Sequence, residues 1–173
     1  MDNISPIDGR YEKTTCVLSK YFSEFSFFKY RLYVELMYFI ALVDILPELQ
    51  TIREPNIKSN IIKIWEIFSK EDYLKIKTYE EMLKHDIKAL EYFIRDKFIE
   101  IDLQDYSTFI HFGITSQDIN TSANILSLKN GLIFCIIPEI KKIEHAIATF
   151  TYNTEDDVML GFTHGQPAVP TTM

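Results

Sequence analysis

The chain has 173 residues, of which 47% are apolar and 14% aromatic, so it can bury enough surface to offset the entropy lost on folding, which excludes wholesale disorder. Its net charge of −7, from 25 acidic and 18 basic residues, argues against a general nucleic-acid surface, because such surfaces need clustered Lys and Arg. The two cysteines, Cys16 and Cys135, match neither a CxxC metal motif nor a disulfide scaffold, which favours a reducing cytosol.

The first twenty residues are expected to form an irregular loop. Ser5-Pro6 and Asp8-Gly9 are turn signals, and Arg10 and Tyr11 follow them directly. This start has neither the basic stretch nor the apolar run of a signal peptide.

A long helix is predicted over residues 21–46, where apolar side chains recur every three or four positions. Glu24, Lys29, Arg31 and Glu35 interrupt this stretch, and charges of this kind are seldom tolerated in a lipid-exposed helix. We therefore interpret it as a core helix and expect no membrane association.

Further helical patterns follow in chain order. One helix is expected over residues 57–68. Ser69 and Asp72 have the spacing of a capping box, which predicts a short helix over roughly 71–77. His85 and Asp86 precede another apolar stripe, so they should lie at the N-terminal turn of the next helix, where backbone N–H groups and the helix dipole favour anions.

The last long helix should follow Thr115 and Asp118, which again have N-cap and N3 spacing. Pro138 permits a break or kink in it. From Thr154 onward we expect a loop, because no alternation typical of a sheet is apparent. The predicted fold class is therefore all-α.

Four segments contain most of the residues suited to chemistry, namely residues 5–11, 84–86, 115–120 and 163–168. Together they offer a guanidinium, a phenol, two imidazoles, hydroxyls and amides, which suit an anionic, hydroxyl-rich ligand rather than a metal. Each segment also has a purely structural interpretation. Arg10 could form a surface ion pair, and both the His85-Asp86 pair and the segment from Thr115 to Asp118 could simply cap helices.

The histidines differ in their surroundings. His164 is followed by Gly165 and lies close to Pro167, so its imidazole should be held on a stiff irregular backbone between helical regions. His145 is expected to be solvated. His111 could be a satisfied core histidine or could line the site.

The order of these motifs resembles the bacterial-type adenylosuccinate lyases, within the fumarase/aspartase superfamily. The motifs are Ser-Pro-x-Asp-Gly-Arg-Tyr, His-Asp-x-Lys-Ala-x-Glu-Tyr-Phe, Phe-Ile-His-Phe-x-x-Thr-Ser-x-Asp-Ile-Asn and Thr-His-Gly-Gln-Pro-Ala-x-Pro-Thr-Thr, and they span nearly the whole chain. The resemblance implies an N-terminal helical domain over residues 1–105 and the first part of a central helical bundle over residues 106–173.

The resemblance also implies an activity. This family eliminates fumarate from adenylosuccinate, giving AMP, and from the succinyl-carboxamide ribotide (SAICAR, giving AICAR) in purine biosynthesis, without a metal or redox cofactor. A base removes a proton beside a carboxylate and an acid protonates the departing nitrogen. Carried over by motif, His164 is the general acid. The implied substrate-binding residues are Arg10, Tyr11, Lys84, His85, Asp86, Thr115 and Ser116, with Gln166 and His111 as possible additions.

Three departures from the family pattern bear on this interpretation. Glu81-Met82-Leu83-Lys84 replaces a common Arg-Thr-Thr-Asn, and Gly161-Phe162 replaces a common Ser-Arg. The family's mobile loop, which carries the serine base, does not occur in this sequence. The chain is therefore expected to be an N-terminal fragment that is inactive alone, and the full-length protein is expected to be a cytoplasmic homotetramer.

Two alternatives stay open at this stage. The first is another lyase of the same superfamily, which nucleotide binding would distinguish. The second is a non-enzymatic helical interaction module, whose exposed apolar stripes would bind a partner.

Overall fold

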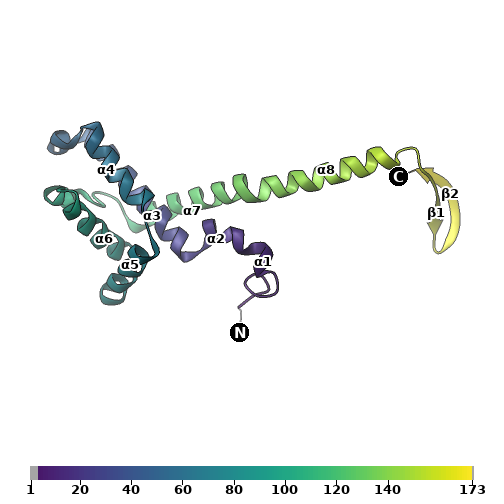
Figure 1. The fold of residues 1–173 in the computed structure, drawn as a ribbon, viewed down its shortest axis with the longest axis horizontal. Helices are drawn as coiled ribbons and strands as arrows, with labels where there is room; N and C mark the ends of the chain where they lie inside the picture. Colours follow the sequence, from purple (N-terminus) through teal and green to yellow (C-terminus); the bar gives the residue numbers. More distant parts are fainter. Residues whose placement is uncertain (1–3, 173) are drawn as a thin grey trace. The chain divides into compact units, whose positions relative to one another are not determined.

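The computed structural model describes residues 4–172 (Figure 1). Residues 1–3 and Met173, where the sequence stops, lie outside the described part. Contacts divide the chain into two units, Met1–Gly131 and Leu132–Met173. Each unit is described by itself.

The described part of the first unit consists of helices joined by turns and contains no strand, which agrees with the predicted all-α class. The second unit adds one small hairpin. In chain order the elements of the first unit are α1 (Glu12–Thr15), η1 (Cys16–Leu18), α2 (Ser19–Phe22), α3 (Glu24–Ile45), η2 (Pro47–Ile52), α4 (Pro55–Glu66), α5 (Lys70–Leu83), α6 (Asp86–Glu100), η3 (Gln104–Phe109) and α7 (Ser116–Gly131). The expectation of an irregular start is wrong for residues 12–20, which form short helical turns.

Helix α3 matches the predicted long helix closely. Its start is set by Ser23, whose hydroxyl accepts a hydrogen bond from the backbone N–H of Ser26 at 3.2 Å. It ends at Leu46, which is extended (ψ 127°) because the residue before a proline is disfavoured in the helical region.

The capping box that begins α5 is present as predicted, but the helix runs to Leu83 instead of ending near residue 77. The Ser69 hydroxyl accepts from the N–H of Asp72 at 3.2 Å, and the Asp72 carboxylate accepts from the N–H of Ser69 at 3.0 Å. A contact with another helix stabilises this extension, because the hydroxyl of Tyr79 donates a hydrogen bond to Asp96 of α6 at 2.6 Å. Local apolar periodicity does not record such a contact.

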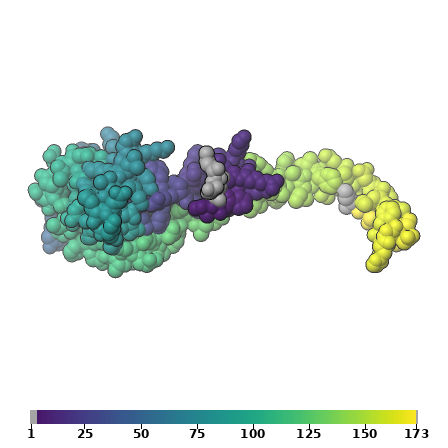
Figure 2. Space-filling view, turned by 90° about the horizontal axis from the view of Figure 1, so that it is seen from below, coloured from purple at the N-terminus to yellow at the C-terminus, as the bar shows by residue number. Residues whose placement is uncertain are grey.

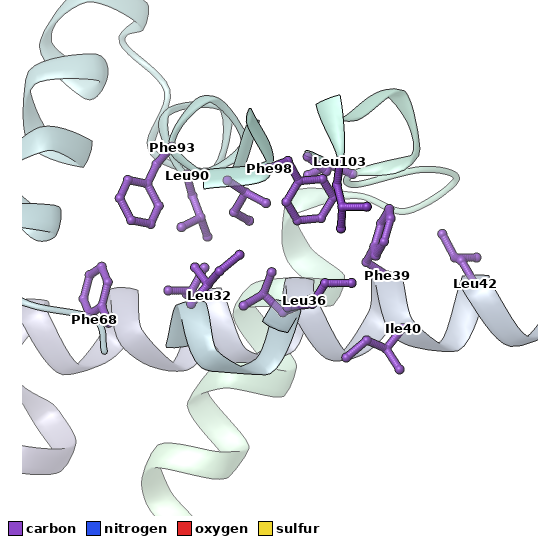
Figure 3. Packing of buried hydrophobic residues seen from close by; sticks show 14 of the residues in the cluster. Leu32, Leu36, Phe39, Ile40, Leu42, Phe68, Leu90, Phe93, Phe98 and Leu103 are labelled. Atoms are coloured by element: carbon purple, nitrogen blue, oxygen red, sulfur yellow. The ribbon is translucent and has the colours of Figure 1, made fainter. Parts of the chain in front are cut away.

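The core of the first unit forms where α3 packs against α4, α5, α6 and α7. Figure 3 shows Leu32 and Leu36 of α3 facing Leu90 and Phe98 of α6, and all four side chains are fully buried. Burial of this kind contributes roughly 1.5–3 kcal/mol per large apolar side chain. This packing fixes α3 as the central element on which the other helices are positioned.

The N-terminal segment is attached to α7. Ser127 donates from its hydroxyl to the backbone carbonyl of Tyr21 at 2.6 Å. Gly131 is buried, and a Cβ added there would lie 2.5 Å from Cζ of Phe22, so only glycine allows this close approach without a shift of the ring. The short turns of α1, η1 and α2 are therefore part of the folded unit.

The second unit consists of the π-helical turn η4 (Leu132–Ile136), α8 (Ile137–Thr154), and the antiparallel strands β1 (Val158–Thr163) and β2 (Gln166–Thr172). The irregular turn precedes Pro138, close to the predicted break. Most side chains of α8 are exposed, and in Figure 2 the hairpin of the same unit does not cover the visible face of this helix, drawn in yellow-green.

The hairpin corrects the expectation of a loop beyond residue 154. Thr163 pairs with Gln166, so His164 and Gly165 form a two-residue connection. Both have positive φ, 52° and 75°, as a type I′ hairpin turn requires. His-Gly is a less common pair for this turn than Asn-Gly, and Pro167 and Pro170 weaken the strand signal, so the sequence pattern did not indicate it.

Within residues 4–172, one helical segment, Ser116–Thr154, is long and apolar enough to cross a membrane by length and composition alone. Its most apolar 18-residue window has a mean hydropathy of 1.3, and 17% of that window is buried. An amphipathic helix whose apolar face packs against protein meets the same criterion. This property by itself therefore does not distinguish a membrane-spanning helix from a helix packed against protein.

Candidate functional site

Two charged residues lie inside the apolar face of α3. Arg31 is 6% exposed and Glu35 2%, and they are one helical turn apart. Buried charges are costly unless they are paired and hydrogen-bonded. These two residues, the α3 charged pair, are therefore the starting point of the candidate site.

Arg31 joins the beginnings of two other helices. Its Nη2 lies 2.8 Å from Oδ2 of Asp86, the first residue of α6. Its Nε donates to Oδ1 of Asn120 in α7 at 2.9 Å, and its guanidinium lies 3.9 Å from the ring centroid of Phe27. Burial lowers the pKa of Arg31 and the charge of Asp86 opposes this, yet an arginine stays protonated in proteins. The cation thus fixes α6 and α7 against α3.

Glu35 holds the segment before α7. Its Oε1 is 2.6 Å from Nδ1 of His111, whose backbone has the unusual φ of 59°. Burial raises the pKa of Glu35, while the charge of His111 and its hydrogen bond act in the opposite direction. The other oxygen, Oε2, is buried and without a hydrogen-bond partner among the described residues.

The same region contains a second buried carboxylate. Glu91 of α6 is 3% exposed, and its Oε2 lies 2.7 Å from Nζ of Lys88. The charge of Glu91 raises the pKa of Glu35 and the charge of Lys88 lowers it, so these two residues of α6 act on the buried carboxyl group of α3.

The predicted segment 84–86 is divided between two positions. His85 is the N-cap of α6, where its Nδ1 accepts from the backbone N–H of Lys88 at 3.2 Å, and its side chain is 52% exposed. Asp86 contacts the α3 charged pair through its ion pair with Arg31. Lys84 is exposed and closes α5 in the left-handed conformation with φ 54°. It borders an open cavity of about 440 Å³ that Lys77, Glu80 and Glu81 also line.

The predicted segment 115–120 lies at the start of α7. Asp118 accepts from both the backbone N–H of Thr115, at 2.8 Å, and its hydroxyl, at 2.9 Å, and these bonds lower the pKa of Asp118. The Thr115 hydroxyl is thus engaged within its own turn. Ser116 begins the helix, and Asn120 reaches Arg31. The hydrogen bond from Arg31 to Asn120 places this segment beside the α3 charged pair.

The N-terminal motif folds on itself. Asp8 accepts from the N–H of Ser5 at 2.8 Å, a bond that lowers the pKa of Asp8. The N–H of Tyr11 donates to the carbonyl of Pro6 at 2.9 Å. Arg10 and Tyr11 are exposed, and the guanidinium lies 5.3 Å from the phenol ring centroid. Within residues 4–172 no hydrogen bond or ion pair joins these two side chains to the α3 charged pair.

His164 and Gln166 belong to the second unit. His164 is the first residue of the hairpin connection and Gln166 begins β2. Both side chains are exposed. The left-handed φ of His164 is unfavourable for a residue with a Cβ, and backbone strain of this kind is frequent at functional sites. His145, expected to be solvated, is exposed on α8.

The structure thus brings together Asp86, His111 and the turn that contains Thr115 and Ser116. The residues that connect them are Arg31, Glu35 and Asn120. Asn120 lies in the predicted segment 115–120, whereas sequence reasoning did not select Arg31 and Glu35. A signal was present, because two opposite charges four positions apart interrupt an apolar helical stripe. Charges at such positions were interpreted only as evidence against a membrane span.

Comparison with known proteins gives a consistent result. Residues 9–173 match the model of a protein family described as Lyase. The chain is 40% identical to an adenylosuccinate lyase of Buchnera aphidicola subsp. Schizaphis graminum, over 98% of this chain and 38% of the relative. It is 44% identical to that of Dictyostelium discoideum, again over 98% and 38%, and 36% identical to that of Escherichia coli K12, with the same coverage. The chain therefore spans 38% of the length of these relatives.

Proposed function

Because this chain belongs to the lyase family that its sequence matches from residue 9 to residue 173, we propose that it forms the N-terminal part of an adenylosuccinate lyase. The reaction releases fumarate from adenylosuccinate, giving AMP, and from SAICAR, giving AICAR. The names of the relatives support the first reaction. The observation that carries the proposal is the cluster in which Arg31 and Glu35 hold two of the four motif segments together, the second through Asp86 and the third through His111 and Asn120.

The proposed chemistry assigns different tasks to the two units. In the first unit, Asp86, His111, Thr115 and Ser116 border the binding site, where N–H groups at the helix starts favour the negative charges of the substrate. Arg31 and Glu35 keep these segments in place. Arg10, Tyr11, Lys84 and His85 are exposed, and we propose that they contact the nucleotide.

In the second unit, His164 is proposed as the general acid. Protonation of the departing nitrogen requires a group whose proton is accessible, and the imidazole is exposed at the tip of the hairpin. Gln166, next to the turn, offers an amide to the same ligand. The serine base of the family lies in a segment that this sequence does not contain, so the chain alone is proposed to be inactive.

Helix α8 supports the proposal that the site is completed by assembly. Ile140, Ile143, Ile147 and Phe150 are all more than half exposed and follow helical spacing. An apolar stripe of this size is typical of an interface, and we propose that it joins the homotetramer of the complete enzyme. We also propose a cytosolic location, which the free thiols of Cys16 and Cys135 support.

A chimera tests this function. Residues 1–173 would replace the matching part of the Escherichia coli relative, and conversion of adenylosuccinate to AMP and fumarate would be followed by absorbance. We expect activity in the chimera, none in the isolated chain, and a loss of about 10²–10⁴-fold in kcat for His164→Ala, the range that general acid catalysis contributes.

The matched control is His145→Ala, which removes another exposed imidazole of the same unit and should leave kcat unchanged. A folded, assembled chimera that failed to convert adenylosuccinate would contradict the proposed function. Equal activity in the two histidine variants would remove His164 from the reaction.

A further inference from the structure

The contact between Glu35 and His111 uses only one nitrogen of the ring. Oε1 of Glu35 and Nδ1 of His111 are 2.6 Å apart, and the two side chains are 1% and 14% exposed. Among residues 4–172, Nε2 forms no hydrogen bond. The ring is thus fixed at one end by a buried carboxyl group, while its other nitrogen has no hydrogen-bond partner among the described residues.

The protons of such a pair can be counted. If the pair holds two protons, it is neutral overall, as carboxylate with imidazolium or as carboxylic acid with neutral imidazole. In the second form the acid donates to Nδ1, so the ring proton lies on Nε2. Nε2 therefore carries a proton in both of these neutral forms. A neutral pair with the acid proton on Oε2 would leave Nε2 unprotonated, but that O–H would be buried without an acceptor among the described residues. The remaining arrangement with an unprotonated Nε2 is a pair with a single proton, which has a net charge of −1.

The surroundings disfavour that negative form. Burial penalises a net charge, and Oε2 of Glu35 is buried without a hydrogen-bond partner among the described residues, which is more costly for a carboxylate oxygen than for a neutral acid. Glu91 of α6 and Asp118 of α7 add negative charge near the pair. Lys88 is the opposing cation near Glu35, but it is paired with Glu91.

The cation of Arg31 is also engaged. It lies one turn before Glu35 on α3 and is paired with Asp86. It therefore leaves the charge of Glu35 to be neutralised by His111. The same burial raises the pKa of Glu35, in agreement with the proton count.

We propose that Glu35 is a positioning residue that keeps Nε2 of His111 protonated, so that the imidazole presents an N–H donor to an anionic oxygen of the ligand. The left-handed backbone of His111, with φ 59°, is a conformation that surrounding contacts must enforce, and Glu35 provides one. The assignment of the recipient as a substrate anion rests on the proposed function, whereas the proton arrangement rests on this contact alone.

Nitrogen-15 NMR of the histidine rings in the complete 173-residue chain tests the arrangement. Near neutral pH, Nε2 of His111 should carry a proton in the wild-type chain. In Glu35→Gln, which has nearly the same shape but no ionisable group, the midpoint for loss of that proton should fall by at least one pH unit, about a tenfold loss of proton affinity.

The matched control is Glu24→Gln, the same substitution on the same helix at a residue that contacts Tyr73 and Lys77. It should leave the titration of His111 unchanged. An unprotonated Nε2 in the wild-type chain, or the same midpoint in Glu35→Gln, would overturn the inference. A Glu35→Asp variant should retain the wild-type behaviour in part if charge, and not mere packing, is responsible.

Adding AMP or fumarate separates this inference from the proposed function. A shift of the Nε2 resonance on addition supports both. If the Glu35-dependent proton is present but neither compound perturbs it, in the chain or in the chimera, the inference stands and the assigned ligand is wrong.

Discussion

Arg31 of α3 and Asp86 of α6 form an ion pair of 2.8 Å in which the arginine side chain is 8% exposed and the aspartate side chain 37%. The asymmetry matters because a buried cation that loses its partner cannot be solvated by water in its place, whereas a partly exposed carboxylate can be solvated. The pair therefore stabilises the start of α6 chiefly by satisfying the arginine.

Replacing Asp86 with alanine should lower the free energy of unfolding by about 1–3 kcal/mol. Arg31 would keep its hydrogen bond to Asn120 but would lose its counter-ion. Urea unfolding followed by circular dichroism measures the change. Asp105→Ala removes an exposed carboxylate of the same unit and should change stability by less than about 0.5 kcal/mol. Equal effects of the two substitutions would show that the buried ion pair does not contribute.

Two glutamates of α3 predict opposite pH dependence. Burial raises the pKa of Glu35 above its ordinary value of 4.5, so between pH 4.5 and the higher folded value the unfolded chain releases a proton that the folded chain keeps. Stability from this group therefore falls as the pH rises. Hydrogen bonds from Lys77 and Tyr73 lower the pKa of Glu24, so its contribution is present above pH 4.5 and is lost as the pH falls through the lower folded value.

The opposite pH dependences can be checked with the single variants Glu35→Gln and Glu24→Gln. Their free energies of unfolding would be measured from pH 3 to pH 8. Relative to the wild-type chain, Glu35→Gln should become progressively more stable as the pH rises. Glu24→Gln should become progressively less stable. Parallel curves for the two variants would contradict the assigned directions.

The capping box of α5 predicts a local loss of stability. Ser69→Ala removes the hydroxyl that accepts from the N–H of Asp72 and should cost about 0.5–2 kcal/mol. Ser59→Ala is the control, because Ser59 is exposed inside α4, where alanine has the higher helix propensity. Thermal unfolding should show a lower Tm for the first variant and an unchanged or slightly higher Tm for the second.

Predictions from the sequence succeeded where one segment contains all the relevant information. The long helix α3 has apolar residues that recur at helical spacing, and the capping box of Ser69 and Asp72 is set by residues three positions apart. His85 and Asp86 were placed correctly at the start of α6 for the same reason. The end of α5 was missed because it depends on Tyr79 reaching Asp96 of another helix.

The sequence by itself determined the all-α class, the starts of α5, α6 and α7 and the order of the motif segments, because helical period, capping and motif spacing are local properties of the chain. Only the tertiary structure decided that Arg31 and Glu35 connect Asp86 with His111 and Asn120, since the cost of burying a charge selects partners that are distant in sequence. It likewise decided that His164 lies in a hairpin turn, because strand pairing between residues 158–163 and 166–172 satisfies the backbone groups of both segments.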